Sequence, residues 1–168
     1  MGPEDRPARP LYTPAERRRR DSSLWTVVQG VLAPLQFAIF LVSLVLVLRA
    51  LATDDGLRAA EISVVVKTLA LYAIMVTGSI WEKVVFGRWL FAPAFFWEDV
   101  VSMLVLALHT AYLAALATGA LRGQALLLLA LAAYATYVIN AAQFLLKLRA
   151  ARMESAGSRA PRLAEALP

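Results

Sequence analysis

The sequence contains no cysteine and a single histidine, His109. Without cysteine there can be no disulfide bond, thiolate metal site, iron–sulfur cluster or cysteine nucleophile, and one histidine excludes a metal cage built from several imidazoles. Charged residues are also scarce, at 17% of the 168 residues, whereas hydrophobic residues make up 60%. Soluble proteins have about 25% charged and roughly 45–50% apolar residues. This composition predicts a membrane protein with one domain.

The hydrophobic residues fall into four long blocks. Residues 22–48, 100–121 and 123–146 contain no charged side chain, and residues 62–81 contain only Lys67. A helix needs about 20 residues to cross a bilayer, and none of the blocks shows the alternation typical of a strand. We therefore predict an all-α integral membrane bundle of four transmembrane helices near 24–48, 61–81, 98–118 and 125–146, the first of them kinked but not ended by Pro34.

Lysine and arginine are distributed unevenly around these spans. The segment before the first span, the 82–99 connection and the C-terminal tail together carry 13 of them, whereas the opposite side carries three. The positive-inside rule then predicts that both termini and the 82–99 connection are cytoplasmic. The net charge of +5 is explained by orientation and by anionic lipid, and no nucleic-acid recognition motif is present. The predicted organisation is a cytoplasmic basic tail (1–23), a transmembrane domain (24–146) and a second basic tail (147–168), with 1–21 and about 150–168 loose.

Polar side chains recur at helical spacing inside the predicted spans. They are either hydrogen-bonding groups between helices or the lining of a polar pocket. They include Ser22, Gln29, Gln36 and Ser43 at intervals of seven, and Thr136, Asn140, Gln143 and Lys147 on one face of the last helix.

Lys67 and His109 favour the pocket, because an ionisable group inside a membrane is costly and often functional. Each also has a simpler explanation. Lys67 can snorkel toward the outer membrane surface or pair with Glu61, and His109 can be a packing residue bonded to Asn140. A functional His109 would be a general acid–base or an axial ligand to a metal already inside a ligand.

The connection between the second and third spans is rich in aromatic residues. Seven of the sixteen aromatic residues, including three of the four tryptophans, lie in residues 81–97. An aromatic belt at the membrane interface explains such an enrichment in part, but it does not explain the carboxylates beside it. Aromatic walls with acids suit a flat apolar ligand that undergoes proton chemistry. The carboxylates are Glu82, Glu98 and Asp99.

The two ends of this connection must lie close together, because a loop of 16 residues joins 81–82 to 98–99. Glu98 and Asp99 stand in the first turn of the predicted third helix. The helix dipole there favours ionised carboxylates, whereas apolar burial and mutual repulsion favour protonated ones. The sequence leaves open which effect dominates.

Four stretches carry a family resemblance: LYTPAERRRRD (11–21), VQGVLAPLQFAIFLVSLVLVLR (28–49), ISVVVKTLALYAIMVTGSIWEKVVFGRWLFAPAFFWEDVVSMLVLALHTAYLAAL (62–116) and ATYVINAAQFLLKLRAAR (135–152). The segment WEKVVFGRWLFAPAFFWEDV is the most specific, because hydrophobicity alone would not produce it. On these stretches the chain resembles the 3-vinyl bacteriochlorophyllide hydratases of bacteriochlorophyll synthesis.

This resemblance implies a hydro-lyase that adds water to the ring-A (position 3) vinyl group of chlorophyllide a or 3-vinyl bacteriochlorophyllide a, giving a 1-hydroxyethyl group. Oxygen comes from water, so no cofactor is expected. The implied partners are the chlorophyllide or bacteriochlorophyllide substrate, the lipid bilayer and neighbouring enzymes of pigment synthesis, without nucleic acid. The implied location is the bacterial inner membrane, either cytoplasmic or intracytoplasmic photosynthetic.

Chemistry, rather than the resemblance, assigns the roles of individual residues. A general acid must protonate the terminal vinyl carbon, and a base must activate the water that attacks the resulting macrocycle-stabilised carbocation. We predict Glu98 or Glu82 as the acid and Asp99 as the group that orients or activates water. The predicted substrate-binding residues are His109 (as an axial ligand to the substrate magnesium), Trp97, Lys83, Arg88 and Asn140. The protein itself is expected to hold no metal.

Two other functions fit the same features. A non-enzymatic pigment carrier or assembly factor would use the same aromatic pocket. A small transporter or channel would use Lys67 and the polar stripes, although broken helices are not evident.

Overall fold

The structure, a computed structural model, describes residues 11–157 of the 168. Over this range it forms five helices joined by short connections, without strands. The helices are α1 (Pro14–Ser22), α2 (Leu24–Thr53), α3 (Leu57–Phe86), α4 (Phe96–Thr118) and α5 (Gly123–Gly157). Arg6, Arg9, Arg159 and Arg162, which contribute to the charge count, lie outside the described residues.

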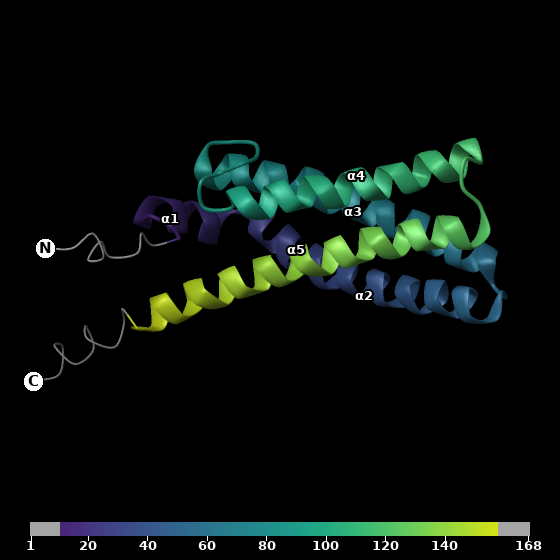
Figure 1. Ribbon diagram of the computed structural model, residues 1–168. Helices are drawn as coiled ribbons and strands as arrows, with labels where there is room; N and C mark the ends of the chain where they lie inside the picture. The colour runs from purple at the N-terminus through teal and green to yellow at the C-terminus, as the bar shows by residue number, and fades with distance from the viewer. Residues whose placement is uncertain (1–10, 158–168) are drawn as a thin grey trace, which may run out of the picture.

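The four long helices are arranged as two hairpins. α2 packs along α3, α4 packs along α5, and the contacts between the two hairpins are sparser. Figure 1 shows all four running side by side. The connections 54–56 and 119–122 lie at one end of the bundle. The 87–95 loop, α1 and the C-terminal end of α5 lie at the other.

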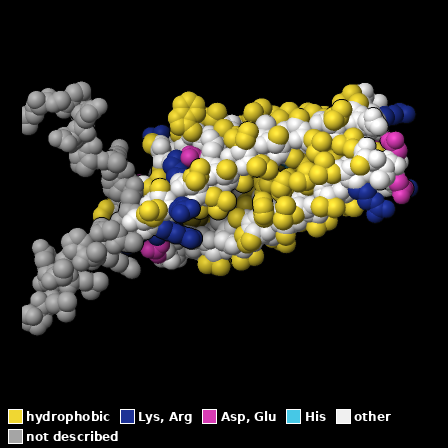
Figure 2. Space-filling model, turned by 60° about the horizontal axis from the view of Figure 1, so that its bottom comes forward, with side chains coloured by type: hydrophobic (Ala, Val, Ile, Leu, Met, Phe, Trp, Pro, Cys, Tyr) yellow, Lys and Arg dark blue, Asp and Glu magenta, His cyan; other side chains and the backbone are white. Residues whose placement is uncertain are grey.

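Hydrophobic residues occupy both the interior and the outer surface of the bundle. The core contains branched residues such as Val47, Val64, Val105 and Leu126, all essentially without exposed surface, and four aromatic residues. The aromatic residues are Phe40, Tyr112, Tyr134 and Tyr137. Leucine and valine side chains also cover the outside, and Figure 2 shows this hydrophobic surface lying between two ends where the charged residues gather. An apolar exterior of this kind is stable only against lipid. α2, α3, α4 and residues 123–153 of α5 are each long and apolar enough to span a membrane, which confirms the predicted four-helix membrane bundle.

The helices are longer than the hydropathy blocks suggested. α2 extends to Thr53, α3 to Phe86 and α5 to Gly157. α2 also continues through Pro34, as predicted. Hydropathy finds the part of a helix that faces lipid, whereas the backbone remains helical into the polar layer until a residue such as Gly87 (φ 79°) ends it.

The expectation of loose tails is wrong for residues 11–21, and also for residues 150–157, which continue α5. Residues 14–22 form α1, which begins with a capping box in which Thr13 and Glu16 bond to each other's backbone N–H groups. Tyr12 is buried, its ring stacks on Phe86, and the Arg20 guanidinium lies 4.6 Å from its centroid. Burial raises the pKa of the Tyr12 hydroxyl. α1 is thus docked against the bundle at the end that carries the 87–95 loop.

Candidate active site

Two acidic side chains from different hairpins meet where α3 ends and α4 begins. Glu82 lies near the end of α3 and Asp99 in the first turn of α4, and both are buried, with exposed fractions of 5% and 4%. Their carboxyl groups lie close enough to interact electrostatically. Two like charges held together in a buried site repel each other, which favours a proton on one of them. The predicted closeness of the two helix ends is therefore observed.

The 87–95 loop is bonded to this carboxyl pair through its own backbone. The N–H of Phe91 donates to Asp99 Oδ2 at 2.7 Å, and the N–H of Ala92 donates to Glu82 Oε2 at 3.2 Å. Phe91 has φ 57°, in the left-handed region that bulky residues seldom adopt. The turn is held by the two acids, and the acids are held in place by the turn.

Glu98 has different surroundings, although it precedes Asp99 directly. Its carboxylate forms an ion pair with Lys147 of α5, with 2.6 Å between Oε2 and Nζ. Asn140 donates to the backbone oxygen of Glu98 at 2.9 Å and accepts a bond from Ser102 at 3.2 Å. Glu98 is thus tied to α5 by an ion pair, whereas Glu82 and Asp99 form no salt bridge with any residue that the structure describes.

Aromatic rings pack around the same end of the bundle. Five of them form an inner aromatic cluster in which Phe95 is central, with its ring centroid 5.7 Å from that of Trp81 and 5.8 Å from those of Phe86 and Phe144. Lys147 Nζ lies 5.1 Å from the Phe95 ring, so the cluster borders the Glu98 ion pair. The members of the inner aromatic cluster are Tyr12, Trp81, Phe86, Phe95 and Phe144.

A second group of rings faces outward on the loop and the first turn of α4. Phe96 lies between Phe91 and Trp97, with centroid separations of 5.8 and 5.4 Å, and Trp97 is 69% exposed. Exposed rings at this density form a surface to which a flat apolar molecule can bind. We refer to Trp89, Phe91, Phe96 and Trp97 as the outer aromatic face.

The predicted cationic residues lie beside this outer aromatic face. Lys83 and Arg88 are both exposed. Lys83 Nζ donates to the backbone oxygen of Gly87 at 3.1 Å and lies 5.8 Å from the Trp89 ring centroid. Both charges are therefore free to meet an anionic group of a molecule bound on the aromatic surface.

His109 is distant from the carboxyl pair. It follows Glu98 by 11 residues on α4, which corresponds to about 16 Å along the helix. It is fully buried, and its Nδ1 bonds to the backbone oxygen of Val105 at 2.8 Å. The expected bond to Asn140 is absent, because Asn140 is used by Ser102 and the Glu98 backbone.

Lys67 is also fully buried, and its Nζ lies 3.7 Å from the centroid of the Tyr137 ring. The expectations that Lys67 snorkels or pairs with Glu61 are therefore wrong. The side chain ends inside the bundle, where Tyr137 of α5 covers it.

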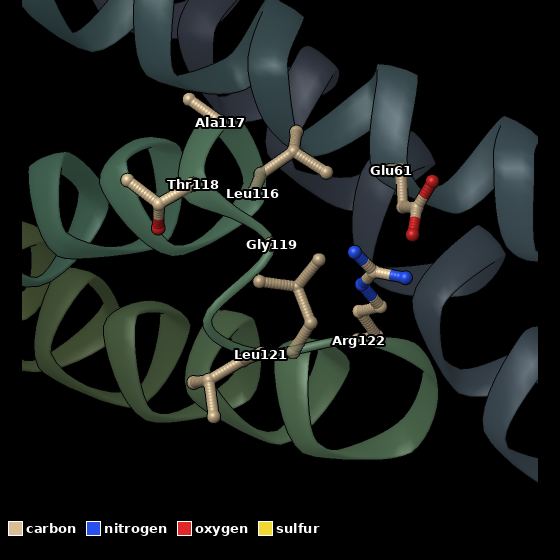
Figure 3. A pocket seen from close by; sticks show the side chains of 8 residues that line it. Glu61, Leu116, Ala117, Thr118, Gly119, Leu121 and Arg122 are labelled. Carbon is tan, nitrogen blue, oxygen red and sulfur yellow. The ribbon is translucent and has the colours of Figure 1, made fainter.

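A cavity of about 360 Å³ lies at the opposite end of the bundle, between the start of α3 and the α4–α5 connection. Figure 3 shows the Glu61 carboxylate and the Arg122 guanidinium facing each other across part of it. The guanidinium lies against Gly119, where a Cβ atom would come within 2.8 Å of Arg122 Nη2. None of the predicted site residues lines this cavity. The carboxyl pair lies at the other end of the bundle, beneath the 87–95 loop.

Comparison with known proteins identifies the family. The family model described as 2-vinyl bacteriochlorophyllide hydratase (BCHF) matches residues 12–150. The chain belongs to the 2-vinyl bacteriochlorophyllide hydratase family. A member from Rhodobacter capsulatus is 63% identical over 154 residues, covering 92% of this chain and 90% of the relative. A member from Cereibacter sphaeroides is 64% identical over 148 residues, covering 88% and 92%. No solved structure matches.

Family membership confirms the resemblance found in the sequence and the assignment to hydro-lyases of bacteriochlorophyll synthesis. It also favours an enzyme over a pigment carrier or a transporter. In the described part of the chain, no group of three or more Asp, Glu, His or Cys side chains is arranged to hold a metal ion.

Sequence reasoning missed two members of this site. Lys147 was noticed only as part of a polar stripe, although it follows Asn140 by seven residues and so shares its face with the residue that bonds to Glu98. Tyr12 gave no signal beyond being an aromatic residue in a polar segment, and the structure places it in the inner aromatic cluster.

Proposed function

We propose that this chain hydrates the ring-A vinyl group of a chlorophyllide-type magnesium macrocycle, and that the Glu82–Asp99 carboxyl pair is its acid–base centre. The two carboxyl groups are buried and are both held by backbone N–H groups of the same loop, and this is the observation that carries the proposal. The names of the relatives supply the substrate class.

Glu82 is the better proton donor of the three acids. It comes from α3, contacts Asp99 and has no cation bonded to it in the described part of the chain. Glu98, in contrast, is bound to Lys147 as an ion pair, and a carboxylate in such a pair accepts or orients rather than donates. This division of roles narrows the sequence prediction, in which Glu98 and Glu82 were equal candidates for the acid.

The reaction then proceeds in two balanced steps. The proton of the pair passes from Glu82 to the terminal vinyl carbon, the C=C π electrons form the new C–H bond, and the positive charge appears on the inner carbon and is delocalised over the macrocycle. Water attacks that carbon and loses a proton to the carboxylate of Asp99, which returns the pair to its starting state. Nearby carboxylates and aromatic faces stabilise the cation electrostatically. The net change is addition of one water to one vinyl group.

The outer aromatic face is the proposed place for the macrocycle. Trp97 and its neighbours offer flat apolar surface on the loop whose backbone holds the two acids. Lys83 and Arg88 lie beside it and suit the substrate propionate. Asn140 acts at one remove, by holding the start of α4 through Glu98. Magnesium ligation by His109 stays a prediction and would require the macrocycle to enter between the helices, because His109 is fully buried.

The protein is a multi-pass membrane protein, and we propose that the carboxyl pair faces the cytoplasmic side. The charge bias supports this, since the end that carries the pair also carries α1 with its four consecutive arginines, residues 17–20. The bacterial inner membrane and association with other enzymes of pigment synthesis stay predictions.

The decisive experiment uses purified protein in detergent, chlorophyllide a and oxygen-labelled water. We expect a product heavier by one labelled water, formed over many turnovers, with the absorption change of a lost vinyl group. Stoichiometric binding without chemical change would instead support the pigment carrier and overturn the proposal. Assays of the Glu82→Gln variant test the assignment of the acid.

A further inference from the structure

Three polar atoms in the middle of the bundle have no hydrogen-bond partner among the described residues. They are Lys67 Nζ on α3 and His109 Nε2 and Tyr112 OH on α4, and each of the three residues has an exposed fraction of 0%. His109 and Tyr112 are three residues apart and so are neighbours on one helix face. Lys67 Nζ lies 3.7 Å from the ring centroid of Tyr137 on α5. The His109 ring centroid lies 5.9 Å from that of Tyr134, which is one helical turn before Tyr137. The three atoms therefore belong to one interior region.

The hydrogen-bonding capacity of each atom is fixed by its surroundings. His109 Nδ1 lies 2.8 Å from the backbone oxygen of Val105, which can only accept. Nδ1 must therefore carry the proton, and in the neutral ring Nε2 is an acceptor with a free lone pair. Lys67 Nζ is a donor, and the Tyr112 hydroxyl can donate or accept. One unsatisfied acceptor thus lies beside one unsatisfied donor and one group that can act as either.

We propose that Lys67, His109 and Tyr112 form an internal water site in the centre of the bundle. Water both donates and accepts, so a single molecule can accept from Lys67 and donate to His109 Nε2. An anion would satisfy Lys67 but would repel the Nε2 lone pair, and a metal cation bound to Nε2 would be repelled by a protonated Lys67. Buried polar groups in native proteins are nearly always paired, with ordered water where no protein atom is available.

The site lies at the seam between the two hairpins, since Lys67 belongs to α3 and His109 to α4. Among the other polar groups of the core, Ser43 bonds to both Ser63 and the Tyr134 hydroxyl at 2.6 Å, whereas Gln36 Nε2 and Gln143 Oε1 also lack a partner among the described residues. The proposed water links α3 to α4. This inference does not rest on the proposed hydratase chemistry.

X-ray radiolytic labelling of the wild-type protein in nanodiscs tests the site directly. Hydroxyl radicals formed from bound water modify the side chains that touch it, even when those side chains are buried. After correction for intrinsic reactivity, we expect Tyr112 to be labelled several-fold faster than Val47 and Leu126, which are equally buried in dry core. Equal rates would overturn the proposal. The measurement uses no substrate, so its failure is independent of the failure of the proposed function.

Two variants strengthen the test. In a folded Lys67→Met/His109→Phe protein, both protein partners of the water are gone, and Tyr112 labelling should fall to the rate of the dry controls; unchanged labelling would overturn the assignment. A second measurement compares the midpoint of thermal unfolding of Lys67→Met with that of the wild type. We expect the midpoint to be unchanged or lower. Arg58→Met, at an exposed position of the same helix, is the control and should also leave the midpoint unchanged or lower it. A clear rise for Lys67→Met alone would mean that Lys67 is unsatisfied in a dry core, and it would contradict the water site. If the double variant does not fold, the wild-type rates decide alone.

Discussion

Replacing Glu82 by glutamine is the sharpest test of the proposed chemistry, because the structure allows the fold to tolerate it. The glutamine amide oxygen can accept the Ala92 N–H that Glu82 Oε2 accepts at 3.2 Å, and its NH₂ group can donate to Asp99, as a protonated carboxyl group would. Both neighbours keep their partners. The side chain has only lost its acidic proton, so an effect on turnover reports on proton transfer rather than on folding.

The size of the expected effect follows from the role. General acid catalysis contributes about 10²–10⁴-fold in rate, which corresponds to about 3–5 kcal/mol of barrier height. We expect the turnover number of Glu82→Gln to fall by this factor, whereas the midpoint of thermal unfolding in detergent stays within a few degrees of wild type. Asp99→Asn should lose activity to a similar extent, because the proposed mechanism uses both groups.

The assay follows loss of the vinyl absorption of chlorophyllide a and confirms the hydroxyethyl product by mass. Glu61→Gln is the matched control, since Glu61 lines the cavity at the opposite end of the bundle, and it should retain wild-type turnover. If the Glu82→Gln rate is within about tenfold of wild type, the loss is smaller than the least effect expected of a general acid, and the assignment is refuted. Equal losses in Glu61→Gln would show that removal of any carboxylate from the bundle impairs the protein.

Four further predictions concern the fold and the orientation of the bundle. Lys147→Met should lower the free energy of unfolding by about 1–3 kcal/mol because it leaves Glu98 without its cation, and adding Glu98→Gln should restore part of that loss in a double-mutant cycle. Tyr12→Ala should cost about 3 kcal/mol through lost ring packing and make α1 sensitive to protease, whereas Tyr12→Phe keeps the stacking seen in the structure. Gly119→Ala should cost about 1–3 kcal/mol because its φ of 69° is strained for a residue with a Cβ; Gly30→Ala, which meets no atom within 4 Å, is the control and should be near neutral in thermal unfolding. A fluorescent protein fused to the C-terminus should mature and fluoresce in the cytoplasm. Activity of a C-terminal reporter that works only outside the cytoplasm would contradict the predicted orientation.

The membrane bundle could be predicted from the sequence because hydropathy over about 20 residues is a strong signal. The proximity of Glu82 and Asp99 could also be predicted, since a short loop leaves two helix ends little freedom to separate. The ion pair of Glu98 with Lys147 was not, because α4 and α5 pack along each other in a register that no local pattern encodes.

Lys67 shows why position along a helix is insufficient. Its place near the outer third of a span suggested snorkelling, but the face of α3 on which it lies turns toward Tyr137. α1 illustrates a related limit. Its arginine-rich sequence has little to bury. Docking depends on the packing of the Tyr12 ring against Phe86 and Phe95 and on the hydrogen bond that Arg19 Nε donates to the backbone oxygen of Val85 at 2.8 Å, and both contacts are set by the tertiary structure.

The arrangement of two hairpins has a consequence for how the protein becomes active. Glu82 belongs to the first hairpin and Asp99 to the second, and the 87–95 loop joins them. A nascent chain that has inserted only α2 and α3 contains Glu82 but not yet Asp99 at its side. If the pair is the proposed acid–base centre, hydration begins only once the second half of the chain has entered the bilayer and packed against the first.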